Sequence, residues 1–113
     1  MEIISEQHNG VTVLRFSAPL ELTAHEAPDF QTSILQNLPE NGRVVLDMAQ
    51  VTFIDSSGLG ILVGLNRRLI RNGGELRLAR PTRSVATVFE ITRLHRFFEI
   101  YDTVEEAVTS FED

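Results

Sequence analysis

The chain has 113 residues, enough for one domain with a continuous core, and its 42% hydrophobic and 23% charged residues are typical of a soluble globular protein. It contains no cysteine, which excludes disulfides, thiolate metal sites and cysteine nucleophiles. A formal net charge of −6 argues against nucleic acid as a partner, because phosphate binding requires a concentrated basic surface. We treat residues 1–113 as a single domain, since the sequence shows neither repeat nor linker.

The sequence also argues against a membrane partner and against a metal site. No apolar run reaches the roughly 18 residues that a membrane helix requires. The first six residues lack the basic start and the apolar stretch of a secretory signal, so a cytoplasmic location is expected. The three histidines, His8, His25 and His95, are too scattered to suggest metal-ligand spacing, and we expect no metal and no cofactor.

The first predicted elements are two short strands at residues 2–7 and 11–17. Asn9-Gly10 between them predicts a hairpin, because both residues tolerate a positive φ. A helix follows at about residues 24–38, with apolar residues at helical spacing, which requires Pro28 to lie in its first turn. Pro39-Glu-Asn-Gly42 is expected to end this helix.

The remaining predicted elements alternate between strand and helix. They are a strand at residues 44–46, a helix at 56–71, a strand at 75–79, a helix at 81–92, a strand at 97–101 and a last helix from Thr103. Asn72-Gly73-Gly74 provides a left-handed end for the second of the four helices. The order predicts an α/β fold with a mixed, mostly parallel sheet of about five strands and about four helices, in which the hairpin supplies an antiparallel edge strand.

The chemistry is concentrated in residues 52–60, Thr-Phe-Ile-Asp-Ser-Ser-Gly-Leu-Gly, which lead from a strand into a helix. The first N–H groups of a helix lack partners inside the helix, and Asp55 or Ser56 could cap them. Capping alone would explain these residues. A phosphate on Ser56 is the second interpretation, because unpaired N–H groups and the helix dipole favour an anion at this position.

A helical wheel of residues 56–71 favours the second interpretation. A core stripe is predicted to contain Leu59, Leu62, Val63, Leu69 and Ile70. The opposite side collects Ser56, Ser57, Gly60, Gly64, Arg67, Arg68 and Arg71. Each glycine costs about 1 kcal/mol relative to alanine inside a helix, so close approach by a partner would explain two of them on an exposed face. Packing against another element of the same fold is the alternative.

The segment Phe53-Ile-Asp-Ser-Ser-Gly-Leu-Gly60, followed by an apolar-arginine helix and Gly73-Gly74, resembles the STAS family, and specifically the anti-sigma-factor antagonists. The likeness extends over nearly the whole chain. It implies that Ser56 is phosphorylated and that the helix from Ser57 contributes to the contact face. The partner-binding residues that we expect on this basis are Asp55, Ser57, Gly58, Gly60, Gly64, Arg67, Arg68 and Glu21.

The resemblance also implies the partners. The kinase would be the anti-sigma factor, which binds ATP and releases its sigma factor when it captures the unphosphorylated antagonist, and a serine phosphatase would restore Ser56. ATP and Mg²⁺ would belong to the kinase. One departure concerns the Gly-Glu-apolar-Asp stretch of the family, whose aspartate lies near the phosphorylated serine. The matching residues here are Ala18-Pro19-Leu20-Glu21, so Glu21 replaces that aspartate.

Three other functions compete with this interpretation. Catalysis is not expected, because the chain has neither a Gly-X-Ser-X-Gly elbow nor a Gly-X₄-Gly-Lys loop, and no base is placed near Ser56. A STAS domain with a non-sigma role, in a stress-sensing assembly or a lipid-transport complex, remains an alternative. Nucleic-acid binding through Arg67, Arg68 and Arg71 is disfavoured by the net negative charge.

Overall fold

The N-terminal hairpin turns at the two residues that tolerate a left-handed backbone. In the computed structural model, which describes residues 1–39 and 42–112, Asn9 and Gly10 have φ values of 53° and 80°. They join β1 (Ile3–His8) to the antiparallel strand β2 (Val11–Phe16). The predicted hairpin is confirmed.

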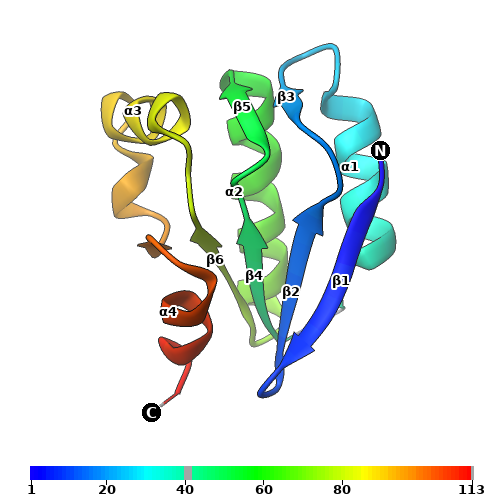
Figure 1. Ribbon diagram of the computed structural model, residues 1–113, viewed down its shortest axis with the longest axis vertical. Helices are drawn as coiled ribbons and strands as arrows, with labels where there is room; N and C mark the ends of the chain where they lie inside the picture. The colour runs from blue at the N-terminus through cyan, green and yellow to red at the C-terminus, as the bar shows by residue number, and fades with distance from the viewer. Residues whose placement is uncertain (40–41, 113) are drawn as a thin grey trace.

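The main sheet contains five strands in the order β1-β2-β4-β6-β7 (Figure 1). Strands β4 (Arg43–Asp47), β6 (Glu75–Ala79) and β7 (Ile100–Tyr101) are parallel to β2, and β1 forms the antiparallel edge. These strands correspond to the five predicted ones, so the mixed, mostly parallel sheet is confirmed.

The last strand is shorter than expected. Of residues 97–101, only Ile100–Tyr101 pair with β6. The chain before them forms a short 3₁₀ helix, η1 (Leu94–Arg96), entered through Arg93 at a φ of 63°. Phe98 then packs its ring edge-on against Phe89, with the two centroids 5.7 Å apart. Burial of this ring therefore replaces strand pairing in the segment.

A second, two-stranded sheet was not predicted. It pairs β3 (Leu20–Leu22) in parallel with β5 (Val51–Ile54). A turn closed by the hydrogen bond from the N–H of Val51 to the carbonyl of Met48, at 3.0 Å, separates β4 from β5. The strand predicted at residues 44–46 is β4, and β5 is a separate strand in the second sheet that leads to the start of the next helix.

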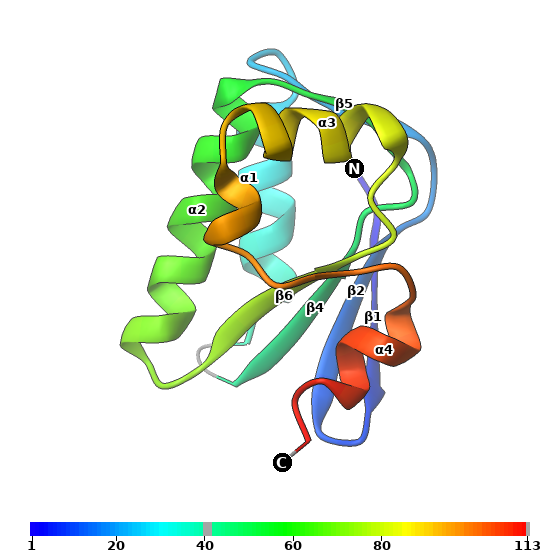
Figure 2. The same cartoon turned by 90° about the vertical axis from the view of Figure 1, so that its left-hand side faces the viewer.

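Helices cover both faces of the main sheet (Figure 2). Helices α1 (Ala27–Asn37) and α2 (Ser56–Arg71) lie on one face, and the short α4 (Val104–Thr109) lies on the other. Helix α3 (Arg83–Ile91) crosses the end of the molecule near β5. The larger core cluster lies beneath α1 and α2 and includes Phe30, Leu62 and Leu69. The smaller one lies beneath α4 and includes Val13 and Val108.

Helix starts follow the capping chemistry of the sequence. Pro28 lies in the first turn of α1, as expected. Helix α3 starts at Arg83 rather than at residue 81, because Thr82 is its N-cap. The predicted cap at Thr103 is confirmed, since its Oγ1 accepts the N–H of Glu106 at 3.0 Å. The expected break at residues 39–42 falls partly on residues 40 and 41, which lie outside the described residues.

The buried side of α2 differs from the predicted stripe. Ile70 was expected in the core but is 51% exposed, whereas Leu65 and Asn66 are buried. Asn66 is only 2% exposed, and its Oδ1 accepts the backbone N–H of Leu76 at 2.9 Å, which ties α2 to β6. Gly73 ends the helix with a φ of 86°, as predicted. The buried side of α2 is therefore rotated away from Ile70, and it includes Asn66, whose side-chain oxygen is hydrogen-bonded.

Candidate functional site

The junction between β5 and α2 is organised by Asp55. Its backbone is extended, and its carboxylate accepts the N–H groups of Ser57 at 2.9 Å and Gly58 at 3.2 Å through Oδ1. The other oxygen, Oδ2, accepts the N–H of Ala24 at 3.0 Å. Asp55, and not Ser56, is therefore the N-cap of α2, and it also joins the helix start to the loop before α1.

These hydrogen bonds hold the carboxylate of Asp55 in its charged form. Desolvation at the helix start raises its pKa, but the backbone N–H groups of Gly58, Ala24 and Ser57 together outweigh that effect and leave the pKa below its ordinary value. A negative charge is thus fixed beside Ser56 at neutral pH.

Ser56 occupies the first position of α2, and its side chain is exposed, whereas that of Ser57 is half-buried. The hydroxyl of Ser56 is therefore open to a modifying enzyme. The expectation that a phosphate on Ser56 would meet unpaired N–H groups is wrong, however. The N–H groups of Ser57 and Gly58 are already bonded to Asp55, so a phosphate on Ser56 would not find them unpaired. It would lie at the surface, close to a second negative charge.

The three glycines near this junction differ in their surroundings. A Cβ on Gly58 would lie 2.4 Å from the carbonyl oxygen of Leu22 and 2.9 Å from Cγ1 of Ile54, so Gly58 permits close packing of α2 on β3 and β5. Apart from its chain neighbours and the nearby backbone of α2 itself, a Cβ on Gly60 or Gly64 would have no atom of the described residues within 4 Å. Both are exposed. Internal packing therefore explains Gly58 but does not explain Gly60 and Gly64.

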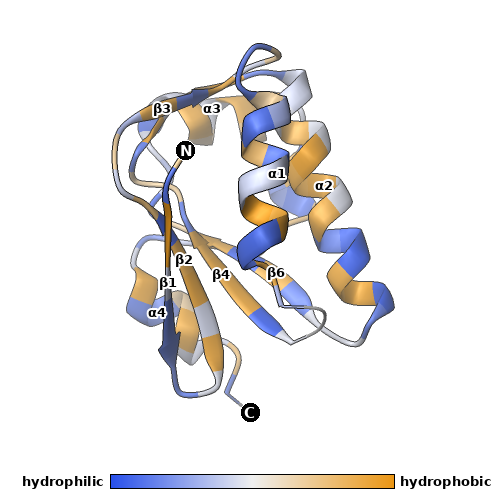
Figure 3. Ribbon diagram, turned by 90° about the vertical axis from the view of Figure 1, so that its right-hand side faces the viewer, coloured by the Kyte–Doolittle hydropathy of each residue, from blue (hydrophilic) through white to orange (hydrophobic). Residues whose placement is uncertain are grey.

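A groove of about 410 Å³ runs between α1 and α2. The two helices lie side by side, as Figure 3 shows. Helix α1 contributes Gln31 and Leu35 to the lining. Helix α2 contributes both serines at its start, the bare backbone of Gly60 and Gly64, and Arg68 and Arg71 near its end. The face that the helical wheel predicted is thus hollowed and open to solvent.

The arginines of α2 separate into two groups. Arg68 and Arg71 line the groove. The guanidinium of Arg67 instead lies 6.0 Å from the centroid of the Phe97 ring, beside η1. All three side chains are exposed. Sequence periodicity placed them on one side but did not reveal that they adjoin different neighbours.

Glu21 lies outside the groove. It is exposed on β3, in register with Phe53 of β5. Phe53 is 45% exposed, a large apolar side chain only three positions before Ser56. Sequence reasoning missed it, as it missed Leu35 on the groove wall, because apolar residues in strands and helices are expected in the core. Gln31 was also missed, and no motif marked it.

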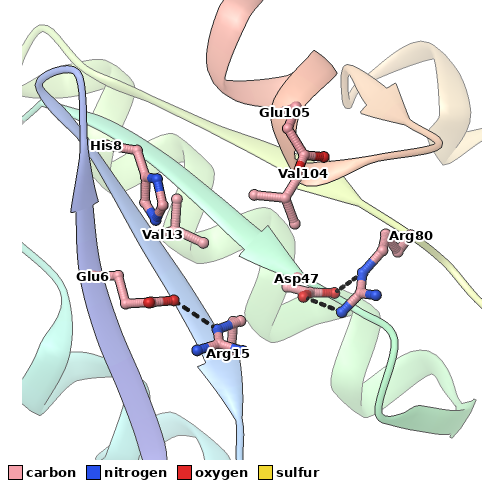
Figure 4. Close-up of a pocket in the computed structure, with 8 residues that line it drawn as sticks. All are labelled: Glu6, His8, Val13, Arg15, Asp47, Arg80, Val104 and Glu105. Carbon is pink, nitrogen blue, oxygen red and sulfur yellow. Dashed lines mark hydrogen bonds and ion pairs between the residues drawn. The ribbon is translucent and has the colours of Figure 1, made fainter.

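A second cleft lies on the opposite face of the sheet, between the hairpin and α4 (Figure 4). Both arginines of the cleft lie against a carboxylate: Arg80 binds Asp47 through two hydrogen bonds, at 3.0 and 2.6 Å, and Nε of Arg15 lies 2.8 Å from Oε1 of Glu6. The hydrogen bond to Asp47 is the main cause that raises the pKa of Arg80. The pairing of the cleft's arginines with carboxylates indicates a structural role.

In residues 1–39 and 42–112, no group of three or more His, Asp or Glu side chains is placed so that it could hold a metal ion. Within the same residues, no helix has both the length and the apolar character needed to cross a membrane.

Several known proteins with a similar sequence or fold are named anti-sigma factor antagonists. The anti-sigma F factor antagonist of Paenibacillus polymyxa is 27% identical over 112 residues, which cover 99% of this chain and 96% of that protein. The crystal structure of an anti-sigma factor antagonist from Mycobacterium paratuberculosis superposes with a TM-score of 0.80 at 25% identity, covering 99% of this chain and 94% of that one.

The antagonist SpoIIAA is similar in two states. Its unphosphorylated form matches with a TM-score of 0.70 at 25% identity, over 96% of this chain and 95% of that one. The phosphorylated form, from Bacillus, matches with a TM-score of 0.62 at 24% identity, over 96% of this chain and 98% of that one. The family model described as STAS domain matches residues 2–107. The chain belongs to the STAS-domain family.

Proposed function

We propose that this domain is an anti-sigma factor antagonist that regulates transcription by partner switching. Unphosphorylated, it binds an anti-sigma factor with serine kinase activity; phosphorylation of Ser56 releases it. The observation that carries the proposal is the placement of Ser56, exposed at the first position of α2 and at one end of the α1–α2 groove. The names of the relatives and the phosphorylated state of SpoIIAA support it.

The contact surface that we propose centres on α2. Ser57, Gly60, Gly64, Arg67 and Arg68 would meet the partner directly. Asp55 and Gly58 would act by position, since one caps the helix and the other lets it pack on β3. Glu21 and its neighbour Phe53 would extend the surface onto the β3–β5 pair.

The phosphate would act by charge and bulk rather than by refolding the domain. It adds a charge of about −1.5 to −2 and three oxygen acceptors at pH 7. Because Asp55 retains the N–H groups at the helix start, the phosphate would stay at the surface and meet the partner. A partner matched to a hydroxyl would then face repulsion and desolvation, while the helix keeps its cap.

The remaining expectations belong to the same proposal. The domain itself would catalyse no reaction and bind no cofactor, because ATP and Mg²⁺ would be held by the kinase. A serine phosphatase would restore Ser56, and the exchange would take place in the cytoplasm.

The test is phosphorylation by the anti-sigma factor kinase encoded in the same genome, with ATP and Mg²⁺. We expect a mass gain of about 80 daltons in the wild type and in Ser57→Ala, and none in Ser56→Ala. A mass gain that persists in Ser56→Ala would mean that a residue other than Ser56 is phosphorylated. No gain in the wild type would favour the alternative, a STAS domain with a role outside sigma-factor control.

A further inference from the structure

The α1–α2 groove has a basic end and no acidic lining. Its lining includes Arg68 and Arg71, while none of the described acidic residues contributes to it. Neither guanidinium has an ion pair with the described residues, although the chain has 16 acidic residues against 10 basic ones. In contrast, Arg15, Arg77 and Arg80 each bind a carboxylate. The groove therefore presents an uncompensated positive pair on an acidic protein.

The helix dipole explains only part of this arrangement. Arg68 and Arg71 lie in the last turn of α2, where a cation is favourable. The dipole gives no reason for Gly60 and Gly64 on the same side of the helix, each of which makes the helix less stable than alanine would. Bare backbone in the middle of a groove, with cations at one end, suits a segment that approaches closely and carries carboxylates.

We propose that the groove receives an acidic amphipathic helix of the anti-sigma factor, with its carboxylates on Arg68 and Arg71. This inference rests on the function proposed above. Leu35, which is 38% exposed on the α1 wall, offers an apolar contact for the other face of that helix. Gly60 and Gly64 allow its backbone to approach α2. Arginine binds carboxylates in a bidentate manner, which fixes the position of the helix along the groove.

The geometry separates docking from phosphoryl transfer. At a rise of 1.5 Å per residue, Arg71 lies about 22 Å along α2 from Ser56. Substitutions at the arginines leave untouched the hydrogen bonds of Asp55 that hold the start of the helix. They should therefore weaken the affinity of the kinase for the domain. The rate of phosphoryl transfer to Ser56 within the complex should not change.

The experiment is steady-state phosphorylation of the purified domain by the anti-sigma factor kinase encoded in the same genome. The test variant is Arg68→Glu/Arg71→Glu. The matched control is Arg83→Glu/Arg96→Glu, which changes the net charge equally at two exposed arginines outside the groove. A neutral pair, Arg68→Gln/Arg71→Gln, covers the case in which charge reversal impairs folding, which thermal melting would reveal.

We expect the groove variant to raise KM by about tenfold or more with kcat within about twofold, because a docking contact is lost and the reacting site is kept. The neutral pair should be intermediate and the control close to the wild type. An equal rise of KM in the control would mean that the kinase is attracted by the electrostatic field of the whole domain and not by the groove. Unchanged KM, or a fall in kcat alone, would also overturn the inference. A wild type that the kinase neither binds nor phosphorylates would instead refute the proposed function.

Discussion

The carboxylate of Asp55 accepts the backbone N–H of Ala24 at 3.0 Å, across 31 positions of the chain. The same side chain caps α2, so a single residue connects the start of that helix to the loop that leads into α1. Ser56, the next residue, is therefore presented on a fixed junction while its own side chain remains exposed. The scaffold holds the modifiable group in place without burying it.

The charge of Asp55 should contribute to stability on the acid side of neutrality. Its pKa in the folded state lies below the ordinary value, so its contribution is complete above that value, about 3.9, and is lost as the pH falls through the folded-state pKa. We expect the melting temperature of the wild type to fall more steeply below about pH 4 than that of Asp55→Asn. The same pH dependence of the melting temperature in both proteins would contradict this assignment.

Alanine substitutions at the glycines of α2 should change the free energy of unfolding in opposite directions. Gly58→Ala forces a Cβ to within 2.4 Å of a backbone oxygen, and should lower the free energy of unfolding by about 1–3 kcal/mol. Gly60→Ala and Gly64→Ala introduce no contact and should raise it by up to about 1 kcal/mol each. Urea denaturation measures all three. Destabilisation by all of them would mean that the exposed glycines also serve the fold.

A bulky residue at Gly64 should weaken partner binding more than it weakens the fold. Gly64→Phe places a ring in the groove, where nothing in the described chain blocks it and where the partner is proposed to lie. Thr87→Phe, at an exposed position of α3, is the control. Titration calorimetry with the anti-sigma factor, alongside thermal melting, separates the two effects. Equal affinity of both variants would place the partner elsewhere.

The two ion pairs of the opposite cleft should differ in their contribution to stability. Asp47 is 3% exposed and also accepts the N–H of Ala49, so Asp47→Ala should cost about 1–3 kcal/mol. Glu6→Ala breaks a pair whose two side chains are each 40% exposed, and should cost less than about 1 kcal/mol. Neither should change phosphorylation of Ser56. Loss of phosphorylation in Asp47→Ala, with a native fold, would implicate that face in function.

Local signals predicted the five strands of the main sheet well. Asn9-Gly10 specifies the hairpin through its backbone freedom, and Thr103 specifies a helix start through its cap. The β3–β5 pair was not predictable in this way. Its strands are three and four residues long, and β5 follows β4 without a glycine or proline to mark the turn. Their pairing depends on tertiary packing.

The site was predictable to the extent that a helical wheel describes it. The wheel correctly placed Ser56, the two glycines and the arginines on the exposed side of α2. It misplaced Ile70, because it could not register the hydrogen bond that draws Asn66 into the core. It also could not show that α1 forms the second wall of the groove, since that wall arises from packing between distant segments.

The most direct measurement of the central claim is the affinity of the anti-sigma factor for the domain before and after phosphorylation of Ser56. We expect the phosphorylated form to bind at least about tenfold more weakly, because a buried contact would then carry an unmatched charge, and to melt close to the temperature of the unmodified form. Equal affinities for the two forms, or a collapsed melting transition after phosphorylation, would contradict the account.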